Sequence, residues 1–440
     1  MPPFVLRHGQ RYDGGGLAAA AAGICLALLT DIASVADCCG GRTRLGRGVA
    51  ITVHVLFSFA GGNGHFQPLV PLAAAAAAAG HSVTVTGRPR MASAVETAGF
   101  TFVATGADRG PPERLRLREL DPEREDRDLR EGFGGWLARD RSVGILALCI
   151  GSRPDLVVCD ETDFGAMIAA ERLGIPSATV LVMAAGSFVR PGLVAEPLSR
   201  LRAEHRLPPD PALTMPSRYL VLSPFPPSFR DPAFPLPATA HPFRSLGSGA
   251  VGDTAPQWPA DPSGPPLVYA TLGTVFNMES GDLFARMLAG LRALPVTLLV
   301  TVGREIDPAE FGPQPTNVHI ERYVSQSSVL PHCSLVMSHG GSGSVIGALA
   351  HGVPLVLAPM GADQPGNVAR CEALGVARAL DALTATPESI GQAATGMLAD
   401  PRYRRAAERI RDEYAALPGP AYGVTLLERL AAERVPILTS

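Results

Sequence analysis

Residues 51–80 read ITVHVLFSFAGGNGHFQPLVPLAAAAAAAG, and this stretch decides the fold. Its first nine residues are mostly apolar and rich in β-branched and aromatic side chains, which is typical of a buried strand. A glycine-rich loop follows, and the alanine-rich segment after it predicts a helix that ends at Gly80. The stretch is therefore a strand, loop and helix unit, from which parallel sheets are built.

The same unit recurs in both halves of the chain. The first half contains further apolar runs that predict strands at 82–86, 101–105, 155–159 and 177–182. In the second half PLVYATLG opens a new series, with predicted strands at 296–302, 317–322, 334–338 and 354–359. Near-continuous apolar strands that alternate with helices indicate parallel sheets covered on both faces. We therefore expect an α/β protein.

The length of 440 residues exceeds what one hydrophobic core usually organises, so we expect two domains. Prolines crowd residues 224–266, which places the boundary there. The predicted parts are an N-terminal extension (1–48), a first domain (49–235), a connection (236–264), a second domain (265–415) and a last helix that can return to the first domain (416–440). The extension is interpreted as a disordered tail or as the product of a start assigned too far upstream.

Composition narrows the class of partner. The formal net charge of −3 gives no basic excess for nucleic acid, and all 38 positive residues are arginine. The apolar run at 17–29 is shorter than the roughly 20 residues that span a bilayer. The seven cysteines lack the paired spacing of a zinc site or a disulfide framework. We therefore expect a cytoplasmic protein with reduced thiols that binds neither membrane nor nucleic acid.

Residues 111–131, PPERLRLRELDPEREDRDLRE, carry dense charge of both signs. Such a run predicts a solvated loop or an exposed helix. We therefore assign it no function from the sequence.

A candidate phosphate site lies at residues 338–344, SHGGSGS, between a predicted strand and a predicted helix. Backbone amides at a helix N-terminus bind phosphate without any net basic charge. Glycines let a diphosphate approach closely, and Ser342 and Ser344 add hydroxyl donors. A glycine-rich turn that binds no ligand would have the same sequence pattern, so the assignment as a phosphate site needs support from other segments.

Two other segments supply them. YVSQ at 323–326 precedes His339, and PMGADQPGN at 359–367 follows it, both at carboxyl ends of predicted strands, where parallel sheets bind ligands. With this spacing, Tyr323 to Asn367 resembles the signature of family 1 glycosyltransferases, and in particular the bacterial enzymes that decorate antibiotics and other natural products. The similarity runs from about Val49 onward. It implies the GT-B fold, two Rossmann-like parallel-sheet domains that face each other across a cleft.

The resemblance also implies how the nucleotide part of a sugar donor is held. The diphosphate would bind one histidine side chain and the amides of the following loop, namely His339, Gly341, Ser342, Gly343 and Ser344. Thr274, in the loop after the strand that ends at Thr271, would add a phosphate contact. The base would meet the backbone near Val324 and Gln326 and stack on Tyr323.

The sugar part would bind Asp363 and Gln364, an acceptor-only carboxylate and an amide that both suit hydroxyl groups. Two positions depart from plant relatives, which usually have tryptophan where this chain has Tyr323 and a ribose-binding glutamate where it has Gly347. Loss of that acceptor fits a nucleotide without a ribose 2′-hydroxyl. We therefore expect no separate cofactor and a dTDP-sugar co-substrate in preference to a UDP-sugar.

A candidate catalytic pair lies in the first domain. His65 follows the opening strand in the loop GGNGHFQP (61–68), and a histidine near its ordinary pKa suits a general base. His65 could instead only cap the next helix. In the family this loop carries the catalytic histidine, and Asp160 matches the aspartate that orients it, although Asp160 could also be a helix cap and Glu161 and Asp163 are nearby alternatives.

The implied reaction is an inverting, metal-independent displacement at the anomeric carbon. The acceptor would be a hydrophobic small molecule held by the apolar segments 131–150 and 183–200. A nucleotide-sugar epimerase of the same fold and a non-catalytic helper protein are the alternatives, and transfer to carbon rather than oxygen would use much the same residues. Monomer and homodimer both stay open.

Overall fold

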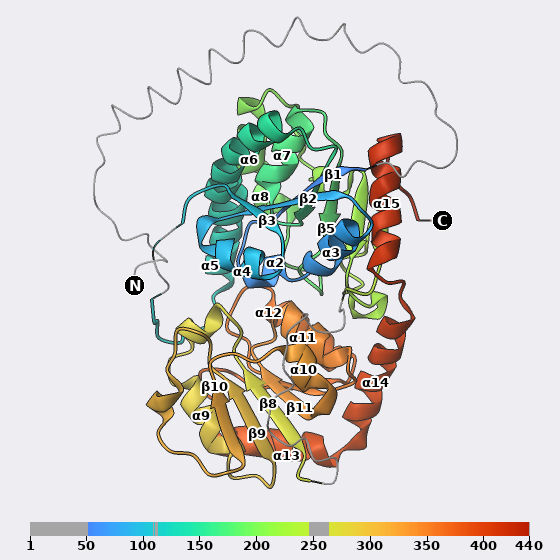
Figure 1. The fold of residues 1–440 in the computed structure, drawn as a ribbon. Coiled ribbons are helices and arrows are strands. Elements are labelled where there is room, and N and C mark those ends of the chain that lie inside the picture. The colour runs from blue at the N-terminus through green and yellow to red at the C-terminus, as the bar shows by residue number, and fades with distance from the viewer. Residues whose placement is uncertain (1–51, 109, 111–112, 246–263, 440) are drawn as a thin grey trace, which may run out of the picture. The chain divides into compact units, whose positions relative to one another are not determined.

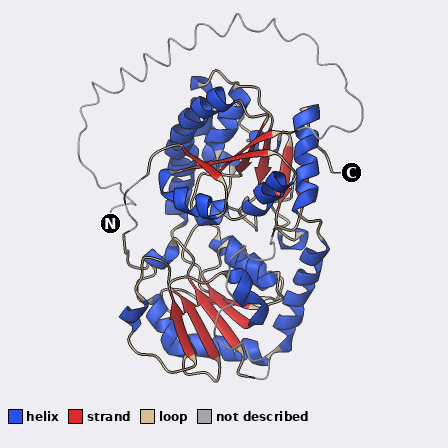
Figure 2. Cartoon of the chain, in the orientation of Figure 1, coloured by secondary structure: helices blue, strands red, loops and turns tan. Residues whose placement is uncertain are grey.

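The computed structural model describes residues 52–108, 110, 113–245 and 264–439. The extension predicted at 1–48 and most of the predicted connection lie outside these residues. Strands are drawn red and helices blue in Figure 2, and both sheets carry helices on their two faces. No helix within the described ranges is both long and apolar enough to cross a bilayer.

The first sheet has seven parallel strands in the order β3-β2-β1-β4-β5-β6-β7. They are β1 (His54–Ser58), β2 (Ser82–Gly87), β3 (Thr101–Ala104), β4 (Leu156–Asp160), β5 (Ser177–Val180), β6 (Leu220–Ser223) and β7 (Ala240–Pro242). Strand β1 pairs with both β2 and β4, so the chain reverses its direction of winding at β1. Loops after β1 and β4 therefore end beside each other, where doubly wound sheets bind ligands.

The second sheet has six parallel strands in the order β10-β9-β8-β11-β12-β13. They are β8 (Leu267–Thr271), β9 (Thr297–Thr301), β10 (Val318–Glu321), β11 (Cys333–Ser338), β12 (Leu355–Leu357) and β13 (Ala377–Ala379). Here β8 pairs with both β9 and β11, which repeats the arrangement of the first sheet. The two sheets confirm the predicted α/β class with two Rossmann-like domains.

Figure 1 labels the helices that cover these sheets. They are α2 (Asn63–Phe66), α3 (Val70–Ala78), α4 (Ala92–Thr97), α5 (Pro122–Arg127), α6 (Ala138–Ser152), α7 (Phe164–Arg172), α8 (Pro191–Glu204), α9 (Leu283–Leu291), α10 (Gln326–Val329), α11 (Ser342–Leu349), α12 (Gln364–Ala373), α13 (Pro387–Ala399), α14 (Pro401–Ala416) and α15 (Pro420–Glu433). A π-helical segment, Asp128–Leu137, joins α5 to α6. Single 3₁₀ turns occupy Pro89–Met91, Met215–Ser217, Pro227–Phe229, Phe276–Glu279, Pro308–Phe311 and Leu330–His332.

Alternation along the strands explains why both faces need helices. In β8, Leu267 and Tyr269 belong to one buried apolar cluster, while Val268 and Ala270 belong to another on the opposite face. Successive strand residues point to opposite faces, so an apolar run without polar interruptions has to be covered twice.

The C-terminal helix α15 packs against the first domain. Leu427 and Leu430 are part of the buried cluster of the first sheet, and a Cβ on Gly423 would lie 2.7 Å from Leu72 Cδ1 on α3. His81 Nε2 lies 3.1 Å from Glu428 Oε1 at the same contact. The last helix thus completes the core around β1.

Two segments differ from the sequence-based expectations. Ala240–Pro242, inside the range assigned to the connection, forms β7 and pairs with β6, so the first sheet extends beyond residue 235. A three-residue strand that includes a proline carries too little pattern to be recognised from sequence.

Residues 111–131, expected to be solvated, are the second difference. We call residues 113–127 the strap, because they join β3 to the π-helical segment of the first domain and yet contact the second domain. Leu115 N–H donates to the Met278 carbonyl at 2.8 Å. The residues of the strap are exposed or partly exposed and include the short helix α5, as expected, but charge density alone did not reveal the backbone contact with the second domain.

Candidate functional site

His65 lies in α2, the single turn that follows β1. Gly62 caps this turn, and the His65 N–H donates to the Gly62 carbonyl at 3.0 Å. A Cβ on Gly61 would lie 2.0 Å from His65 Cδ2, so only glycine at position 61 lets the ring fold back against the loop. The side chain is 14% exposed, which leaves an edge of the imidazole open to a ligand.

Two side chains from the end of β4 hold the His65 ring. Thr162 Oγ1 lies 3.2 Å from His65 Nδ1, and Asp160 Oδ1 lies 3.4 Å from the same nitrogen. The Thr162 hydroxyl donates its hydrogen to Asp160 Oδ1 at 2.6 Å. Because its hydrogen is used in this bond, the hydroxyl can act toward His65 only as an acceptor. Nδ1 must then carry the ring hydrogen, so Nε2 is the basic nitrogen of the neutral ring.

Asp160 is fully buried and firmly oriented. Its Oδ2 accepts from Ala60 N–H at 2.6 Å, and its Oδ1 accepts from Thr162 N–H at 2.7 Å. Burial lowers the pKa of His65, but the Asp160 carboxylate outweighs this effect, with smaller contributions from Asp363 and Glu161, and the net pKa lies above its ordinary value. The carboxylate thus favours the protonated form of the His65 ring.

The other two carboxylates considered from the sequence have different partners. Glu161 Oε1 accepts from Val182 N–H at 2.6 Å and Met183 N–H at 2.7 Å, and burial raises the pKa of Glu161 to about 7. Asp163 forms a fully buried ion pair with Arg141, with 2.8 Å between Oδ2 and Nη2. Among the three, Asp160 is the one that reaches His65.

The buried ion pair belongs to a polar network beneath the same loops. Ser58 Oγ donates to Asp163 Oδ2 at 2.7 Å, and Arg141 Nη1 donates to Thr105 Oγ1 at 2.8 Å. Asp163 Oδ1 also accepts from Ala166 N–H and so caps α7. The network ties β1 and α7 together directly beneath the candidate catalytic pair.

One aromatic ring stacks on His65 and contacts a second ring. Phe133, on the π-helical segment, stacks on the His65 ring with 6.0 Å between centroids and 21° between planes. Phe188 meets Phe133 edge-on at 5.7 Å. Both rings come from the segments that the sequence analysis assigned to the acceptor, and π-helical turns are frequent at functional sites.

In the second domain, His339 directly follows β11 and begins the loop that leads to α11. Burial lowers the pKa of His339 to about 4, so the ring is neutral near pH 7, and its buried Nδ1 has no hydrogen-bond partner within the described residues. A Cβ on Gly273, at φ +74°, would lie 2.7 Å from His339 Cε1. The glycine therefore brings the loop with the exposed Thr274 against His339.

The amides at the start of α11 differ in their partners. Gly341 caps this helix without any side-chain bond, which leaves the N-terminal turn open beside Gly343 and the buried Ser344. Ser342, however, donates to Asp363 Oδ2 through both its N–H (3.2 Å) and its hydroxyl (2.6 Å). Ser342 therefore orients Asp363, and its hydroxyl is not available to a phosphate in this arrangement.

Asn367, on α12, fixes the same carboxylate from the other side. Its side-chain amide donates to Asp363 Oδ2 at 2.7 Å and to the Gly340 carbonyl at 3.0 Å. Two backbone amides of the first domain also bond to these side chains. Ala184 N–H donates to Ser342 Oγ (2.8 Å), and Ala185 N–H donates to Asn367 Oδ1 (3.1 Å). One carboxylate oxygen of Asp363 is thus held by three donors, and the other can face a ligand.

Gln364 is buried at the start of α12. Its Oε1 accepts from Met360 N–H at 2.7 Å and from Gly361 N–H at 3.3 Å. These bonds fix the orientation of the amide, so the Nε2 donor is the group that can turn to a sugar hydroxyl.

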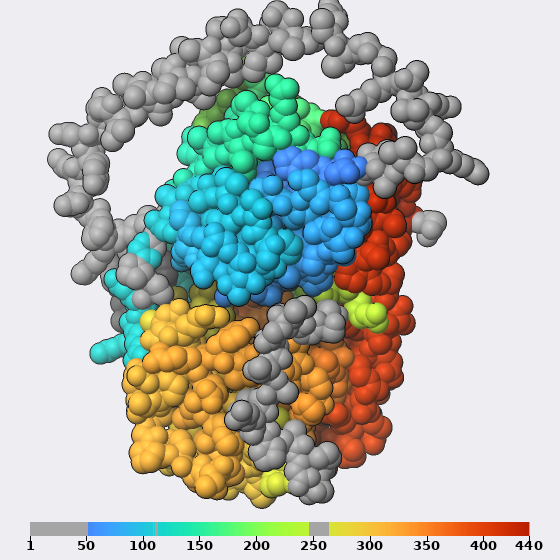
Figure 3. Space-filling model, viewed as in Figure 1, coloured from blue at the N-terminus to red at the C-terminus, as the bar shows by residue number. Residues whose placement is uncertain are grey.

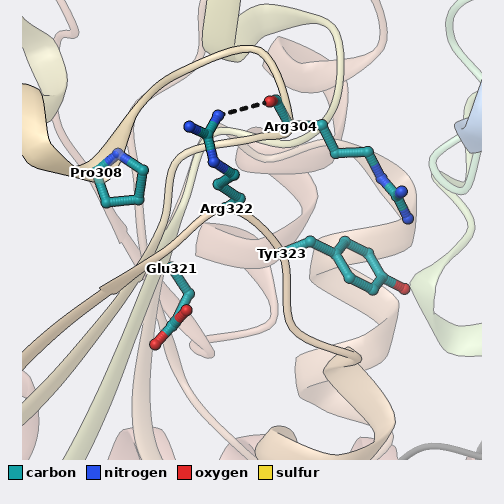
Figure 4. A pocket seen from close by; sticks show the side chains of 5 residues that line it. All are labelled: Arg304, Pro308, Glu321, Arg322 and Tyr323. Carbon is teal, nitrogen blue, oxygen red and sulfur yellow. Dashed lines mark hydrogen bonds between the residues drawn. The ribbon is translucent and has the colours of Figure 1, made fainter.

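Tyr323 lines a surface pocket of about 530 Å³ together with Arg304, Pro308, Glu321 and Arg322 (Figure 4). The tyrosine is 58% exposed, and the Arg304 guanidinium lies 4.9 Å from its ring centroid. The Arg322 side chain donates to the Arg304 carbonyl at 3.0 Å, which fixes the loop that carries Arg304. Arg304 therefore covers one face of Tyr323.

Gly347, on α11, lies against the segment that the sequence predicts to bind the base. A Cβ there would lie 3.2 Å from Leu330 Cδ1 and 3.4 Å from Gln326 Oε1. The position thus lies next to Gln326, and close packing against Leu330 is a structural reason for glycine there. Val324 and Gln326 are both partly buried at the start of α10.

The sequence analysis missed three contacts of this site. Thr162 lies between His65 and Asp160, Phe133 stacks on His65, and Asn367 holds Asp363. Asn367 stands within the recognised segment, so its proximity to Asp363 was a usable signal. Thr162 stands two residues after Asp160, but its contact with His65 spans 97 positions and left no local signal. Phe133 lies in a segment assigned to the acceptor, but its stacking on His65 could not be read from the sequence.

Known proteins resemble this chain over most of its length. Residues 286–430 match the family described as "Erythromycin biosynthesis protein CIII-like, C-terminal domain". The chain is 30% identical over 428 residues to 4'-demethylrebeccamycin synthase of Lentzea aerocolonigenes, an alignment that covers 86% of this chain and 99% of that protein. It is also 30% identical to 10-deoxymethynolide desosaminyltransferase of Streptomyces venezuelae, over 84% and 95% of the two chains.

A solved structure shares the whole described architecture. The glycosyltransferase SsfS6 of Streptomyces sp. SF2575, complexed with thymidine diphosphate, superposes with a TM-score of 0.69 at 26% identity and covers 86% of this chain and 99% of its own. The chain therefore belongs to the bacterial GT-B glycosyltransferases of antibiotic and natural-product biosynthesis.

Proposed function

We propose that this enzyme transfers a deoxysugar from a dTDP-sugar to a hydroxyl group of an apolar natural product, with inversion at the anomeric carbon. The observation that carries the chemistry is the arrangement of His65, Thr162 and Asp160. It supports a base whose Nε2 is free while Nδ1 is held at 3.2 Å by the Thr162 hydroxyl.

In the proposed step, His65 Nε2 takes the proton of the acceptor hydroxyl. The oxygen then forms a bond to the anomeric carbon as the bond from that carbon to the diphosphate breaks. Attack from the side opposite the leaving group inverts the configuration, and the nucleoside diphosphate leaves with the bonding pair. The open amides at the start of α11 are suited to the charge that develops on the leaving phosphate.

An apolar acceptor is supported by the rings beside the proposed base. Phe133 and Phe188 form a T-shaped pair next to His65. Aromatic faces at this place favour a flat or apolar molecule over a free sugar.

We expect Phe133→Ala to raise the KM for an apolar aglycone about tenfold, because the acceptor loses a face of contact beside the base. The donor KM should stay within about twofold, which serves as the internal control. Phe133→Leu keeps apolar bulk, so its acceptor KM should lie between those of the wild type and Phe133→Ala. Initial rates over a series of aglycone concentrations measure this, and an unchanged acceptor KM in Phe133→Ala would refute the placement of the acceptor.

A deoxyribonucleotide donor is supported by Gly347, which leaves no carboxylate beside Gln326, and by SsfS6, which was solved with thymidine diphosphate. In a thermal-shift panel we expect dTDP to stabilise the chain more than UDP or GDP. A ligand at about 100 times its Kd stabilises the folded protein by about 2.7 kcal/mol, a change that a thermal-shift assay detects. UDP binding at least about tenfold tighter than dTDP would contradict the proposal.

Gly347→Glu provides the matched variant for this panel. A carboxylate at 347 would offer an acceptor for a ribose 2′-hydroxyl, so the preference for dTDP over UDP should shrink. Because Leu330 Cδ1 must move to admit the side chain, the unfolding temperature without ligand is recorded first. An unaltered preference in a folded variant would assign Gly347 to packing.

Two alternative functions predict different experimental results. A nucleotide-sugar epimerase would change the donor sugar without any acceptor, which analysis of the sugar product reveals. A non-catalytic helper would bind nucleotide but form no product with any aglycone.

A further inference from the structure

The strap is anchored to the second domain at more than one place. Arg114 donates to both carboxylate oxygens of Glu310, at 2.7 Å each. Leu117 packs against an apolar cluster of the second sheet, where Gly281, at φ +54°, admits it so closely that a Cβ would lie 3.0 Å from the Leu117 nitrogen. The cyan chain of the strap runs beside the yellow segment that follows β8 in Figures 1 and 3.

The strap ends on helix α5, where Glu125 also reaches the second domain. Glu125 Oε2 accepts from Ala362 N–H at 2.9 Å. Asp121 caps α5 by accepting from Glu123 N–H and Arg124 N–H, so the turn that carries Glu125 is fixed. The Glu125 side chain is only 23% exposed, and Arg124 Nη2 lies 3.4 Å from its Oε1.

The loop that Glu125 contacts leads directly into the predicted sugar residues Asp363 and Gln364. Three consecutive amides of this loop donate to side-chain oxygens. Those of Met360 and Gly361 bond to Gln364, within the loop's own domain, and that of Ala362 bonds to Glu125.

The conformation of Ala362 needs this external support. Its φ is +55°, in the left-handed region that a residue with a Cβ rarely adopts. Its methyl group also packs against the apolar cluster of the first domain. Strained backbone of this kind persists where its surroundings hold it in place, and such places are often ligand sites.

We propose that Glu125 is a positioning residue for the donor sugar, and that it acts by holding Ala362 so that Asp363 and Gln364 face the sugar. The inference rests on the proposed function, because it takes Asp363 and Gln364 as the sugar contacts. It assigns a role to a segment of the first domain that the sequence gave no reason to connect with the donor.

The geometry separates this role from nucleotide binding. The predicted base and diphosphate contacts lie at 274, 323–326 and 339–344, whereas Glu125 hydrogen-bonds to Ala362 and Arg124. When the bond to Glu125 is lost, Ala362 can leave the left-handed region and turn the backbone of Asp363 away. The affinity for the sugar part should then fall while the affinity for the nucleotide part stays.

The test measures the Kd of dTDP and of dTDP-glucose by isothermal titration with the full chain. Glu125→Ala should raise the Kd of dTDP-glucose about tenfold, which is the effect of one hydrogen bond to a charged acceptor. It should change the Kd of dTDP less than about twofold. Glu125→Gln keeps an oxygen that can accept from Ala362 N–H, so it should lose less than about threefold.

Glu123→Ala is the matched control, since Glu123 lies on the same helix with a side chain that is 91% exposed. It should change neither Kd. The proposal is overturned if Glu125→Ala leaves dTDP-glucose unchanged, or if it weakens dTDP and dTDP-glucose equally. The wild-type comparison of dTDP with UDP tests the donor proposal separately, and if UDP binds better, the same variants are compared with UDP and UDP-glucose.

Discussion

Replacement of His65 by alanine should lower kcat by roughly 100- to 10,000-fold, the usual contribution of a positioned general base. The variant loses the nitrogen that accepts the acceptor proton, whereas the donor contacts in the second domain are untouched. Donor Kd should therefore stay within about twofold of the wild type. Initial rates with saturating donor and acceptor give the first quantity, and calorimetric titration gives the second.

The pH dependence of the wild type tests the same role. Burial lowers the pKa of His65, but the charge and hydrogen bond of Asp160, with smaller contributions from Asp363 and Glu161, together outweigh it. The net pKa is raised, so the ring becomes protonated at a higher pH than an ordinary histidine. A base must be neutral to act, so kcat/KM should rise with pH through the raised pKa and level off above it. Full activity of His65→Ala, or a flat profile between about pH 5 and 8, would contradict general-base catalysis by His65.

Replacement of Asp163 by asparagine should lower the free energy of unfolding by about 3–5 kcal/mol, because it leaves the Arg141 charge buried without its partner. Both side chains are fully buried, and the pair also anchors Ser58 and caps α7. Guanidinium chloride unfolding, followed by circular dichroism, measures the loss.

The double variant Arg141→Met with Asp163→Asn separates charge from packing. Removing both charges avoids the unpaired cation, so part of the lost stability should return. Glu204→Ala, which breaks the exposed pair with Arg139, should have a far smaller effect. If Asp163→Asn is no worse than Glu204→Ala, the buried network does not stabilise the loops beneath His65.

Much of the fold could be predicted because its strands are long apolar runs. The runs at 51–59, 155–159 and 334–338 correspond to β1, β4 and β11, and their pairing follows from the parallel pattern. Strand β7 and the π-helical segment could not be predicted. The former has only three residues, and the latter has no sequence period that distinguishes it from an α-helix.

The candidate site was predictable where the chemistry is local in sequence. His339 and Asp363 stand in one recognisable segment, and His65 follows a strand in a glycine-rich loop. Glu125 could not be found in this way, because it stands in a charged run and its partner Ala362 lies 237 positions away. Contacts across such a separation depend on how the loops are folded, which no local pattern contains.

The joint between Ser342, Asn367 and the loop at Ala184 and Ala185 has a consequence for engineering. On the first-domain side, the groups that donate are main-chain amides. The hydroxyl of Ser342 and the amide of Asn367 thus recognise the backbone of this loop, while the buried methyl groups of Ala184 and Ala185 require small side chains there. A first domain from a related enzyme could be grafted onto this second domain and still make the same joint, provided that its loop follows the same course and carries small residues at these two positions.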